Sequence, residues 1–484
     1  MLCEKRSVDM ALVICPFWGV NMPPLGVSSI VSNLEARGLR IGVADFNIEC
    51  FRRAGLNLQK FWTMDFSECW DDFSLFCKIR GLLDEHINYC VERTLSFNCK
   101  VIGLSVFASN RFFSIEVIKG IRQIAPEKIV IVGGRGVVTA HERNIFPGDT
   151  VNYFFIGEGE QSIIPFLGAI KNNEPVPEGI GFVRYEDRMR QANIYIIQDL
   201  NELLSPTYRE FDLSKYQEKV LPIIISRGCI SHCAFCDDWR LSGLYRFRKA
   251  EVVFKEIEYY VKNYGITNFL FFDLSVNANP RELKRLCDYI IESNLKITWV
   301  ASAIPAKWMN LGLFKKMSQA GCFTLVYGIE SGSSKVLKLM NKLFTPEEAA
   351  QVMEDTHEAG INVQINLITG FPGEGDDEFR QTVEFIRKNR ENISGITNLN
   401  ACNVTRGSTL FLKAKELGIS FPENPVLHDS RWNIGDINTY QIRQARAIEL
   451  MGLVKDLNLA IFTSNVFAKD QDKTDEKVYS VGKE

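Results

Sequence analysis

The sequence lacks the features that mark several large classes of protein. It contains no run of about 18 apolar residues, so no transmembrane helix is expected. It contains no internal repeat and no low-complexity tract. Neither sign of charge is in excess: 56 Lys and Arg face 59 Asp and Glu, and a net charge of -3 gives no overall attraction for nucleic acid or anionic membrane. With 46% hydrophobic and 24% charged residues, the composition excludes a wholly disordered, collagen-like or coiled-coil chain.

We expect neither a secretory leader nor a disulfide framework. The apolar run after Lys5 and Arg6 is interrupted by Pro16, Pro23 and Pro24, and no A-x-A cleavage site follows it, so we interpret the run as a buried first strand. The 13 cysteines are an odd number, and most are scattered without regular spacing. This pattern favours free, buried thiols in a reducing compartment, and we expect a cytoplasmic protein.

Residues 1–170 alternate between strand and helix patterns. The strands are short, apolar and β-branched, and Gly, Ser or Asn residues bound them. Residues 51–98 interrupt the alternation, because they lack β character and carry aromatic residues at helical spacing. We interpret them as a helical insertion whose aromatics form a core, with a cover over the site as the second interpretation (Trp62, Trp70, Phe73 and Phe76). The alternation predicts a Rossmann-like α/β domain with its site at the carboxyl ends of parallel strands.

A second strand–helix series follows a mixed, polar connector at residues 171–220. Over residues 221–407 six strands alternate with helices, which predicts a partial (β/α)6 barrel, smaller than an eight-stranded barrel. Residues 408–484 are expected to be a mainly helical C-terminal region. Its last residues are charged and lack periodic hydrophobics, so they are expected to form a disordered tail.

One group of cysteines stands apart from the rest. The segment SRGCISHCAFCDDW places Cys229, Cys233 and Cys236 at C-x3-C-x2-C spacing, directly after the first strand of the expected barrel. Parallel barrels carry their chemistry at the carboxyl ends of their strands. Structural zinc sites take four ligands, usually from two C-x2-C type pairs, and no second pair follows this segment. Three cysteines suit a four-iron cluster with one iron left without a protein ligand. A zinc site and a coincidental buried trio are the alternatives.

The cysteine segment, the six-stranded barrel and two later motifs resemble the radical S-adenosylmethionine (radical SAM) superfamily. The resemblance implies that Cys229, Cys233 and Cys236 ligate a 4Fe-4S cluster. The open iron would chelate S-adenosylmethionine (SAM), and one electron would cleave SAM to a 5′-deoxyadenosyl radical. It implies SAM contacts from Phe235 beside the cluster, from Glu330 and Ser331 in YGIESGS, and from Gly370 in NLITGFPGE. Asp273 and Ser302 are added as residues expected to line the SAM site. The superfamily's glycine pair after the second strand is absent from FFDLSVN.

The Gly-rich turns of the N-terminal domain resemble those of cobalamin-binding domains fused to radical enzymes. The expected cobalamin contacts are Pro24, Leu25, Gly26, Ser105, Phe107, Gly133, Gly134, Glu158, Gly159 and Glu160. No G-x-G-x-x-G fingerprint is present, which argues against a dinucleotide site. The nearest string to the cobalt-ligating D-x-H-x-x-G motif is DEHINY, which contains His86 but lacks the glycine and lies in the helical insertion. We therefore expect no histidine below the cobalt, and assign His141 to surface or capping duty.

The two expected cofactors lead to one main hypothesis. The protein is expected to be a cobalamin-dependent radical SAM methyltransferase, in which the deoxyadenosyl radical abstracts hydrogen from an sp3 carbon and methylcobalamin delivers the methyl group. The alternatives are a non-methylating radical enzyme (ring contraction, cyclisation or C–C coupling) and a cobalamin-dependent sensor. A tRNA methylthiotransferase would need a second cysteine trio and a basic tail, and neither is present. No catalytic residue is assigned.

The expected partners follow from this chemistry. They are a small-molecule, lipid or peptide substrate and an external electron donor of the flavodoxin or ferredoxin type. Nucleic acid is disfavoured by the near-neutral charge. In the C-terminal region, Arg431, Trp432 and Tyr440 are candidates for a substrate pocket.

Overall fold

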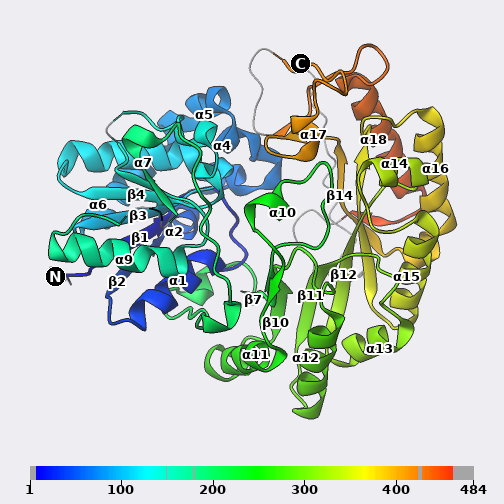
Figure 1. Cartoon of the computed structure of the whole chain (residues 1–484), viewed down its shortest axis with the longest axis horizontal. Helices are drawn as coiled ribbons and strands as arrows, with labels where there is room; N and C mark the ends of the chain where they lie inside the picture. The colour runs from blue at the N-terminus through cyan, green and yellow to red at the C-terminus, as the bar shows by residue number, and fades with distance from the viewer. Residues whose placement is uncertain (1–6, 149, 178, 180, 423–427, 462–484) are drawn as a thin grey trace. The chain divides into compact units, whose positions relative to one another are not determined.

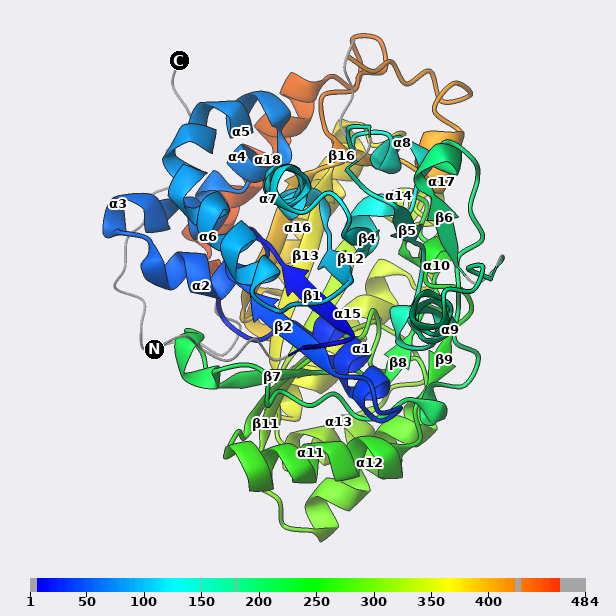
Figure 2. The same ribbon diagram turned by 90° about the vertical axis from the view of Figure 1, so that its left-hand side faces the viewer.

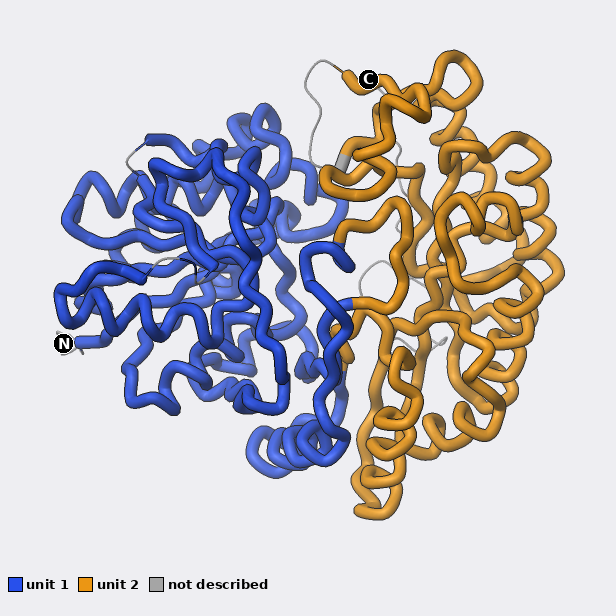
Figure 3. The backbone as a smooth tube through the Cα atoms, viewed as in Figure 1, with its two compact units in different colours: residues 1–228, 238–269 blue, residues 229–237, 270–484 orange. Residues whose placement is uncertain are grey.

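The structure is a computed structural model in which the chain divides into two compact units (Figure 3). Unit 1 comprises residues 1–228 and 238–269, and unit 2 comprises residues 229–237 and 270–484. The cysteine loop therefore belongs to unit 2, whereas the chain immediately before and after it belongs to unit 1. The described residues are 7–148, 150–177, 179, 181–422 and 428–461, so the expected tail lies outside them.

Unit 1 contains a mainly parallel sheet. Its strands are β1 (Met10–Ile14), β2 (Ile41–Asp45), β3 (Val101–Ser105), β4 (Ile129–Gly133), β5 (Tyr153–Phe155) and β6 (Phe182–Arg184). Their order in the sheet is β2-β1-β3-β4-β5-β6, and β6 is antiparallel to β5. Every residue of β1 is buried, as is typical of a parallel strand with helices on both faces. The order reverses between β1 and β3, and open α/β sheets bind ligands at such a switch point.

Helices cover both faces of this sheet (Figures 1 and 2). On one face α1 (Leu25–Glu35) contacts α9 (Gly159–Asn172). On the other face α6 (Asp84–Leu95) contacts α7 (Arg111–Ile124). The helices cover the faces of the sheet. The edge at the carboxyl ends of the strands is formed by the segments that follow each strand.

Residues 51–98 are helical in the structure. Trp62, Trp70 and Phe76 are buried, and the rings of the two tryptophans meet edge to face at 5.1 Å between centroids. Phe73 is 64% exposed. Most of these aromatics are therefore core residues, and Trp70 and Phe76 also contact the rings of Phe113 and Phe112 on α7. The helices of this part are α2 (Phe46–Arg53), α3 (Leu56–Gln59), α4 (Glu68–Asp71), α5 (Phe73–Arg80) and then α6.

The last part of unit 1 flanks the cysteine loop. It contains β7 (Val220–Ile223), β8 (Ser226–Arg227), α10 (Asp238–Leu241), β9 (Arg246–Phe247) and α11 (Ala250–Tyr264). β8 pairs antiparallel with β9. The cysteine loop and α10 therefore leave and return to one two-stranded ladder.

Unit 2 continues the strand–helix alternation, and its strands after β10 (Asn268–Phe271) form parallel pairs. These strands are β11 (Thr298–Ala303), β12 (Cys322–Glu330), β13 (Asn362–Thr369), β14 (Gly395–Ala401) and β17 (Ala460–Ile461). The intervening helices are α12 (Pro280–Glu292), α13 (Leu311–Gln319), α14 (Ser334–Leu339), α15 (Pro346–Glu358) and α16 (Asp376–Lys388), and they line the outer side of these strands (Figure 1). The expected α/β fold class is confirmed.

Within unit 2, the C-terminal part packs onto the preceding strands and helices through one apolar cluster. Trp432 is at its centre with 0% exposure, together with Phe371 and Leu410. The elements here are α17 (Thr409–Leu412), the antiparallel pair β15 (Val404–Thr405) and β16 (His428–Asp429), and α18 (Tyr440–Asp456). None of the helices in the described part of the chain is long and apolar enough to cross a membrane.

Candidate functional site

The cysteine loop is fixed through its backbone. Within unit 2, Ala234 donates its N–H to Met340 O at 2.9 Å, and its carbonyl accepts from the N–H of Leu410 at 2.8 Å. The side chain of Asn341 donates to His232 O at 2.8 Å. These bonds hold the middle of the loop, so the cysteines on either side of it are presented by an ordered backbone.

The three loop cysteines carry thiols of the kind that ligate an iron–sulfur cluster. All three are half-buried free thiols, and Cys229 Sγ accepts from the N–H of Ser231 at 3.4 Å. Among the described residues, no three His, Cys, Asp or Glu side chains come together closely enough to hold one metal ion. A four-iron cluster places each thiolate on a different iron and needs no such convergence.

A buried lysine lies beside the cysteine loop. Lys342 Nζ donates to Gly328 O at 2.9 Å and pairs with Glu330 Oε1 at 3.2 Å. The same ammonium lies 5.4 Å from the ring centroid of Phe235, in a cation–π contact. Burial opposes its charge, but Glu330 and Cys233 outweigh burial and raise the pKa of Lys342. Sequence reasoning missed this residue, because a lone lysine twelve positions after the YGIE motif carries no pattern.

The lysine also acts on the cysteines. Burial raises the pKa of the Cys233 thiol, and the Lys342 charge opposes this increase. A cation next to cluster ligands offsets part of the negative charge that a thiolate-ligated cluster brings into a buried site. The structure thus brings three predicted site residues, Cys233, Phe235 and Glu330, around one cation that the sequence did not reveal.

Two predicted SAM contacts are engaged within the protein. Ser331 Oγ hydrogen-bonds with Thr382 Oγ1 at 3.1 Å and accepts from the N–H of Ser333 at 3.1 Å. Gly370 donates its N–H to Glu374 Oε1 at 2.6 Å. The last two residues predicted to line the SAM site lie on other elements. Ser302 is half-buried on β11, and Asp273 is buried after β10.

The turn at Gly370 needs glycine for two reasons. Its φ is +70°, and a Cβ there would lie 2.1 Å from Arg443 Cγ of α18. Arg443 in turn lies 3.6 Å from the ring centroid of Trp432. The C-terminal helix therefore supports the turn that the sequence links to adenosine.

The substrate-pocket hypothesis for the C-terminal region is wrong for Trp432. Its indole is fully buried and donates to Cys402 O at 2.8 Å. Arg431 is paired with Asp429 at 2.9 Å. Tyr440 is half-buried at the start of α18. The sequence suggested a pocket because large polar-tipped side chains cluster here. It could not reveal that Trp432 belongs to the apolar cluster against which Ala234 and Phe235 of the cysteine loop pack.

In unit 1 the turns after β1 and β3 meet at the switch point. Ser109 Oγ donates to Phe17 O at 2.6 Å, and Asn110 Nδ2 donates to Cys15 O at 3.3 Å. Ser105 at the end of β3 and Phe107 in the turn that follows are half-buried, and the sequence predicts that both contact cobalamin.

The start of α1 is open. Pro24 is buried, Leu25 is half-buried and Gly26 is exposed, with nothing within 4 Å of where its Cβ would lie. Gly134 serves packing instead: its φ is +104°, and a Cβ there would lie 2.5 Å from Val106 O. The turn after β1 thus leaves its backbone accessible at Gly26, whereas the turn after β4 packs closely on Val106.

The histidines agree with this arrangement. His86 lies on α6 with 9% exposure, and His141 is exposed on α8 (Ala140–Arg143). Neither belongs to the turns after β1 and β3. Neither histidine is therefore placed at the switch point of the sheet.

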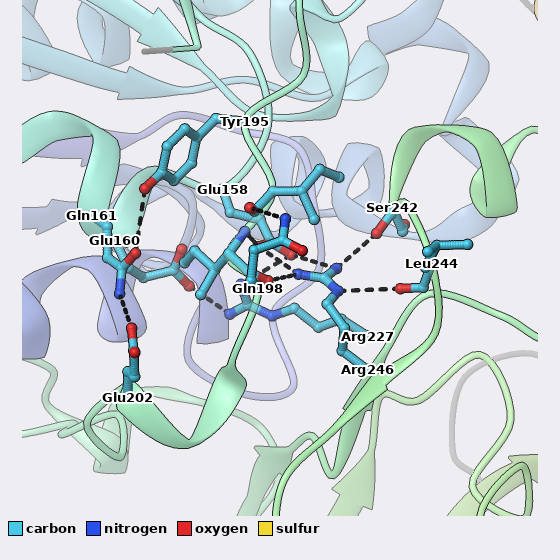
Figure 4. Close-up of polar contacts among 12 residues, drawn as sticks. Glu158, Glu160, Gln161, Tyr195, Gln198, Glu202, Arg227, Ser242, Leu244 and Arg246 are labelled. Atoms are coloured by element: carbon cyan, nitrogen blue, oxygen red, sulfur yellow. Dashed lines mark hydrogen bonds and ion pairs between the residues drawn. The ribbon is translucent and has the colours of Figure 1, made fainter.

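Glu158 and Glu160 carry charges that are already satisfied. Glu160 Oε1 accepts from Ser29 Oγ at 2.9 Å and pairs with Arg227 at 2.5 Å, and Glu158 pairs with Arg246 (Figure 4). Burial alone would raise the pKa of Glu160, but Arg227 outweighs it and lowers that pKa. Gly159, between them, begins α9.

Comparison with known proteins matches the part of the chain that contains the cysteine loop. Residues 223–386 match the model of the radical SAM superfamily. This match covers less than half of the chain, and it makes the segment similar to a radical SAM domain. The segment contains the cysteine loop, Lys342 and the turn at Gly370, and the chemistry of such domains uses a 4Fe-4S cluster and SAM.

Similar sequences extend beyond the radical SAM domain. The chain is 26% identical over 299 residues to an "Uncharacterized methyltransferase PH0819" of Pyrococcus horikoshii, covering 60% of the chain and 65% of that protein. It is 23% identical to the cytidylyl-2-hydroxyethylphosphonate methyltransferase of Streptomyces wedmorensis, covering 75% and 72%. It is 21% identical to the anaerobic magnesium-protoporphyrin IX monomethyl ester cyclase of Cereibacter sphaeroides, covering 60% of the chain and 49% of that protein. The chain thus spans about half to three quarters of these relatives.

Two solved structures share the fold over nearly the whole chain. The radical SAM methyltransferase TsrM of Kitasatospora setae, with cobalamin and a [4Fe-4S] cluster bound, matches with a TM-score of 0.66 at 15% identity, covering 96% of this chain and 92% of that one. The cobalamin-dependent SAM radical enzyme OxsB, with aqua-cobalamin and SAM bound, matches with a TM-score of 0.70 at 16% identity, covering 93% and 67%. The chain therefore shares its fold with both proteins over most of its length.

Proposed function

We propose that the protein is a cobalamin-dependent radical SAM methyltransferase that acts on an sp3 carbon. The observation that carries the proposal is the presence in one chain of the C-x3-C-x2-C loop of a radical SAM domain and a parallel sheet with an open switch point between β1 and β3. The names of the similar sequences and of TsrM, most of them methyltransferases, support the same reaction.

The cysteine loop would hold the cluster, and its surroundings would hold SAM. Cys229, Cys233 and Cys236 would each ligate one iron, and the backbone bonds of Ala234 keep the loop from collapsing when a large group binds. Lys342 and Glu330 form a buried pair beside the loop. Because Lys342 is held by Gly328 O as well, it cannot turn away from the cysteines without losing a buried hydrogen bond.

The switch point of unit 1 would hold cobalamin. Its turns offer backbone groups around Ser105 and Phe107 and an open approach at Gly26. When both are bound, the cluster and SAM supply the radical that takes a hydrogen atom, and cobalamin carries the methyl group. The chain's own part is to bind these groups, orient them and exclude water.

A test that needs no knowledge of the substrate uses SAM with a deuterated methyl group. The anaerobically reconstituted enzyme is mixed with cobalamin, a reductant and this SAM, and the corrinoid and nucleosides are extracted for mass spectrometry. The proposal predicts S-adenosylhomocysteine and a corrinoid that carries the labelled methyl group. Release of 5′-deoxyadenosine with no label on the corrinoid would refute methyl transfer and favour a non-methylating radical reaction. A protein that produces neither is a sensor rather than an enzyme.

The proposal extends to partners and compartment. The substrate is a small molecule, lipid or peptide, and the electron donor is a flavodoxin- or ferredoxin-like protein. The free thiols that surround the cluster ligands in sequence suit a reducing compartment such as the cytoplasm. Among the described residues no disulfide is formed, and the cysteines in the core are buried.

A further inference from the structure

The two ends of the cysteine loop are both fixed within unit 1. On the near side, Arg227 is two positions before Cys229, and on the far side Asp238 is two positions after Cys236. Arg227 pairs with Glu160 at 2.5 Å and with Glu158 at 3.3 Å. Asp238 pairs with Arg135 of the turn after β4. The partners of both flanks are thus the turns that follow β4 and β5.

The near side is part of a compact network of two arginines and two glutamates (Figure 4). Glu158 receives Arg246 in a two-pronged contact, with N–O distances of 2.9 and 3.0 Å. Arg246 also donates to Ser242 O at 2.7 Å. Arg227 is 17% exposed and Glu160 is 5% exposed, so these charges depend on one another rather than on water.

The backbone around this network leaves little freedom. Arg227 and Arg246 face each other in the β8–β9 ladder. Gly228, which links Arg227 to Cys229, has a φ of +82°, and a Cβ there would lie 2.8 Å from Leu244 O and 2.9 Å from Gly243 O. Only glycine fits that approach, so the chain enters the cysteine loop in one direction.

We propose that Arg227 and Arg135, with their partners Glu160, Glu158 and Asp238, are positioning residues that fix the two ends of the cluster-binding loop. The carboxylates after β5 therefore act on the cluster through Arg227, and they are not contacts to cobalamin. The turns of the N-terminal sheet divide their work: those after β1 and β3 face the ligand, and those after β4 and β5 hold the cysteine loop.

The consequence is a coupling inside the protein. A radical SAM cluster must keep one iron open and correctly placed for SAM, and the loop that holds it contains only seven residues between Gly228 and Cys236. Small displacements at either flank change the coordination geometry of the cluster, and cluster spectra respond to such changes. Arg227 touches neither cofactor in this account, and acts through the loop alone.

The test separates positioning from cobalamin binding. Glu160→Gln, Arg227→Met and Arg227→Lys are prepared anaerobically, and iron and cobalt per chain are measured together with the electron paramagnetic resonance (EPR) spectrum of the reduced cluster, with and without SAM. We expect Glu160→Gln and Arg227→Met to keep cobalt within twofold of the unchanged protein. Their cluster signal is expected to be altered, with iron lost to a chelator at least tenfold faster. Arg227→Lys, which keeps the charge, is expected to restore much of the original signal.

A matched control removes a buried carboxylate elsewhere in unit 1. Glu256 is paired with Arg248, and both side chains are at most 4% exposed. Glu256→Gln is expected to lower general stability while leaving the EPR signal unchanged. If Glu256→Gln alters the cluster as much as Arg227→Met does, the effect is general destabilisation and the proposal is overturned.

Two further outcomes are decisive. Loss of cobalt from Glu160→Gln with an unchanged cluster signal would make Glu160 a cobalamin contact and overturn the proposal. Should Arg227→Met fail to fold, Arg135→Met tests the other flank, where the pair is about two-fifths exposed and its loss is tolerated more easily. An unchanged cluster signal and iron-release rate in Arg135→Met would then overturn the proposal. These readouts do not depend on methyl transfer, so they stand whether or not the proposed reaction is correct.

Discussion

Asp45 provides a test of how the N-terminal sheet is stabilised, because it is a buried carboxyl group held by hydrogen bonds from a tyrosine and a backbone N–H. It lies at the carboxyl end of β2, where it caps α2 by accepting from the N–H of Ile48 at 3.2 Å. Its Oδ2 accepts from Tyr216 Oη at 2.8 Å. Burial raises the pKa of Asp45 from 3.8 to about 6, and the hydrogen bonds from Tyr216 and Ile48 only partly oppose the increase.

The sign and size of the effect follow from linkage. A carboxyl group whose pKa is higher in the folded state favours folding when protonated, and this contribution is lost as the pH rises from the unfolded pKa through the folded pKa. At about 1.36 kcal/mol per pKa unit, the raised pKa of Asp45 costs the folded state about 2 kcal/mol at pH 5, where the folded carboxyl group is mostly protonated, and about 3 kcal/mol at pH 8. Asp45→Asn keeps an acceptor for Ile48 and removes the charge. It is therefore expected to be more stabilising at pH 8 than at pH 5, by about 1 kcal/mol relative to the unchanged protein.

Urea unfolding with pulsed hydrogen exchange and mass spectrometry measures this difference on peptides from β1 to β3. Asp199→Asn is the control, because hydrogen bonds from Asn201 lower the pKa of Asp199 and it titrates below this pH range. The control is expected to show no change between pH 5 and pH 8. If Asp45→Asn is as stabilising at pH 5 as at pH 8, or if it destabilises more at pH 8, the reasoning from burial is refuted.

The contacts around the cysteine loop make three further predictions. Lys342→Met is expected to lower the midpoint potential of the cluster in a spectroelectrochemical titration, because it removes a cation that favours the more negative reduced cluster. Lys342→Arg should restore most of the original potential, and an unchanged potential in Lys342→Met would contradict the placement of Lys342 beside the cluster. Gly370→Ala is expected to cost about 2 to 5 kcal/mol from strain and overlap and to weaken SAM binding at least tenfold by calorimetry. Gly360→Ala carries the strain alone, because φ is +79° there and a Cβ would make only an ordinary contact, with Ser318 Oγ at 3.9 Å; equal effects of the two changes would count against the overlap. Cys233→Ala should lose most of its iron in a colorimetric assay, and Cys402→Ala, a buried thiol outside the loop, should not; equal iron in both would remove Cys233 from the cluster.

Much of the fold was predictable because local patterns determine it. The strand MALVI is apolar throughout and becomes a central strand with every residue buried. The spacing of Cys229, Cys233 and Cys236 identified the loop and its chemistry, since three thiols so close in sequence serve few other purposes. The Gly-rich turns at Gly26 and Gly134 were visible too, but the sequence could not tell that one is open and the other packs on Val106.

The contacts that the sequence could not reveal join residues far apart in the chain. Glu160 and Arg227 are 67 positions apart, and neither lies in a pattern that marks an ion pair. A glutamate in a Gly-rich turn is therefore equally compatible with a ligand contact and with an internal charge pair. The same reason explains Trp432, which the sequence suggested for a pocket and which the structure buries under Arg443.

The central claim is that one chain binds cobalamin in its N-terminal domain and an iron–sulfur cluster in its radical SAM domain. The most direct measurement is cobalt and iron per chain after anaerobic purification from cells supplied with cobalamin. The account predicts about one cobalt and about four irons for each chain. Folded, iron-loaded protein without cobalt would contradict it, because the sheet of unit 1 would then be a scaffold and the reaction would have to proceed without cobalamin.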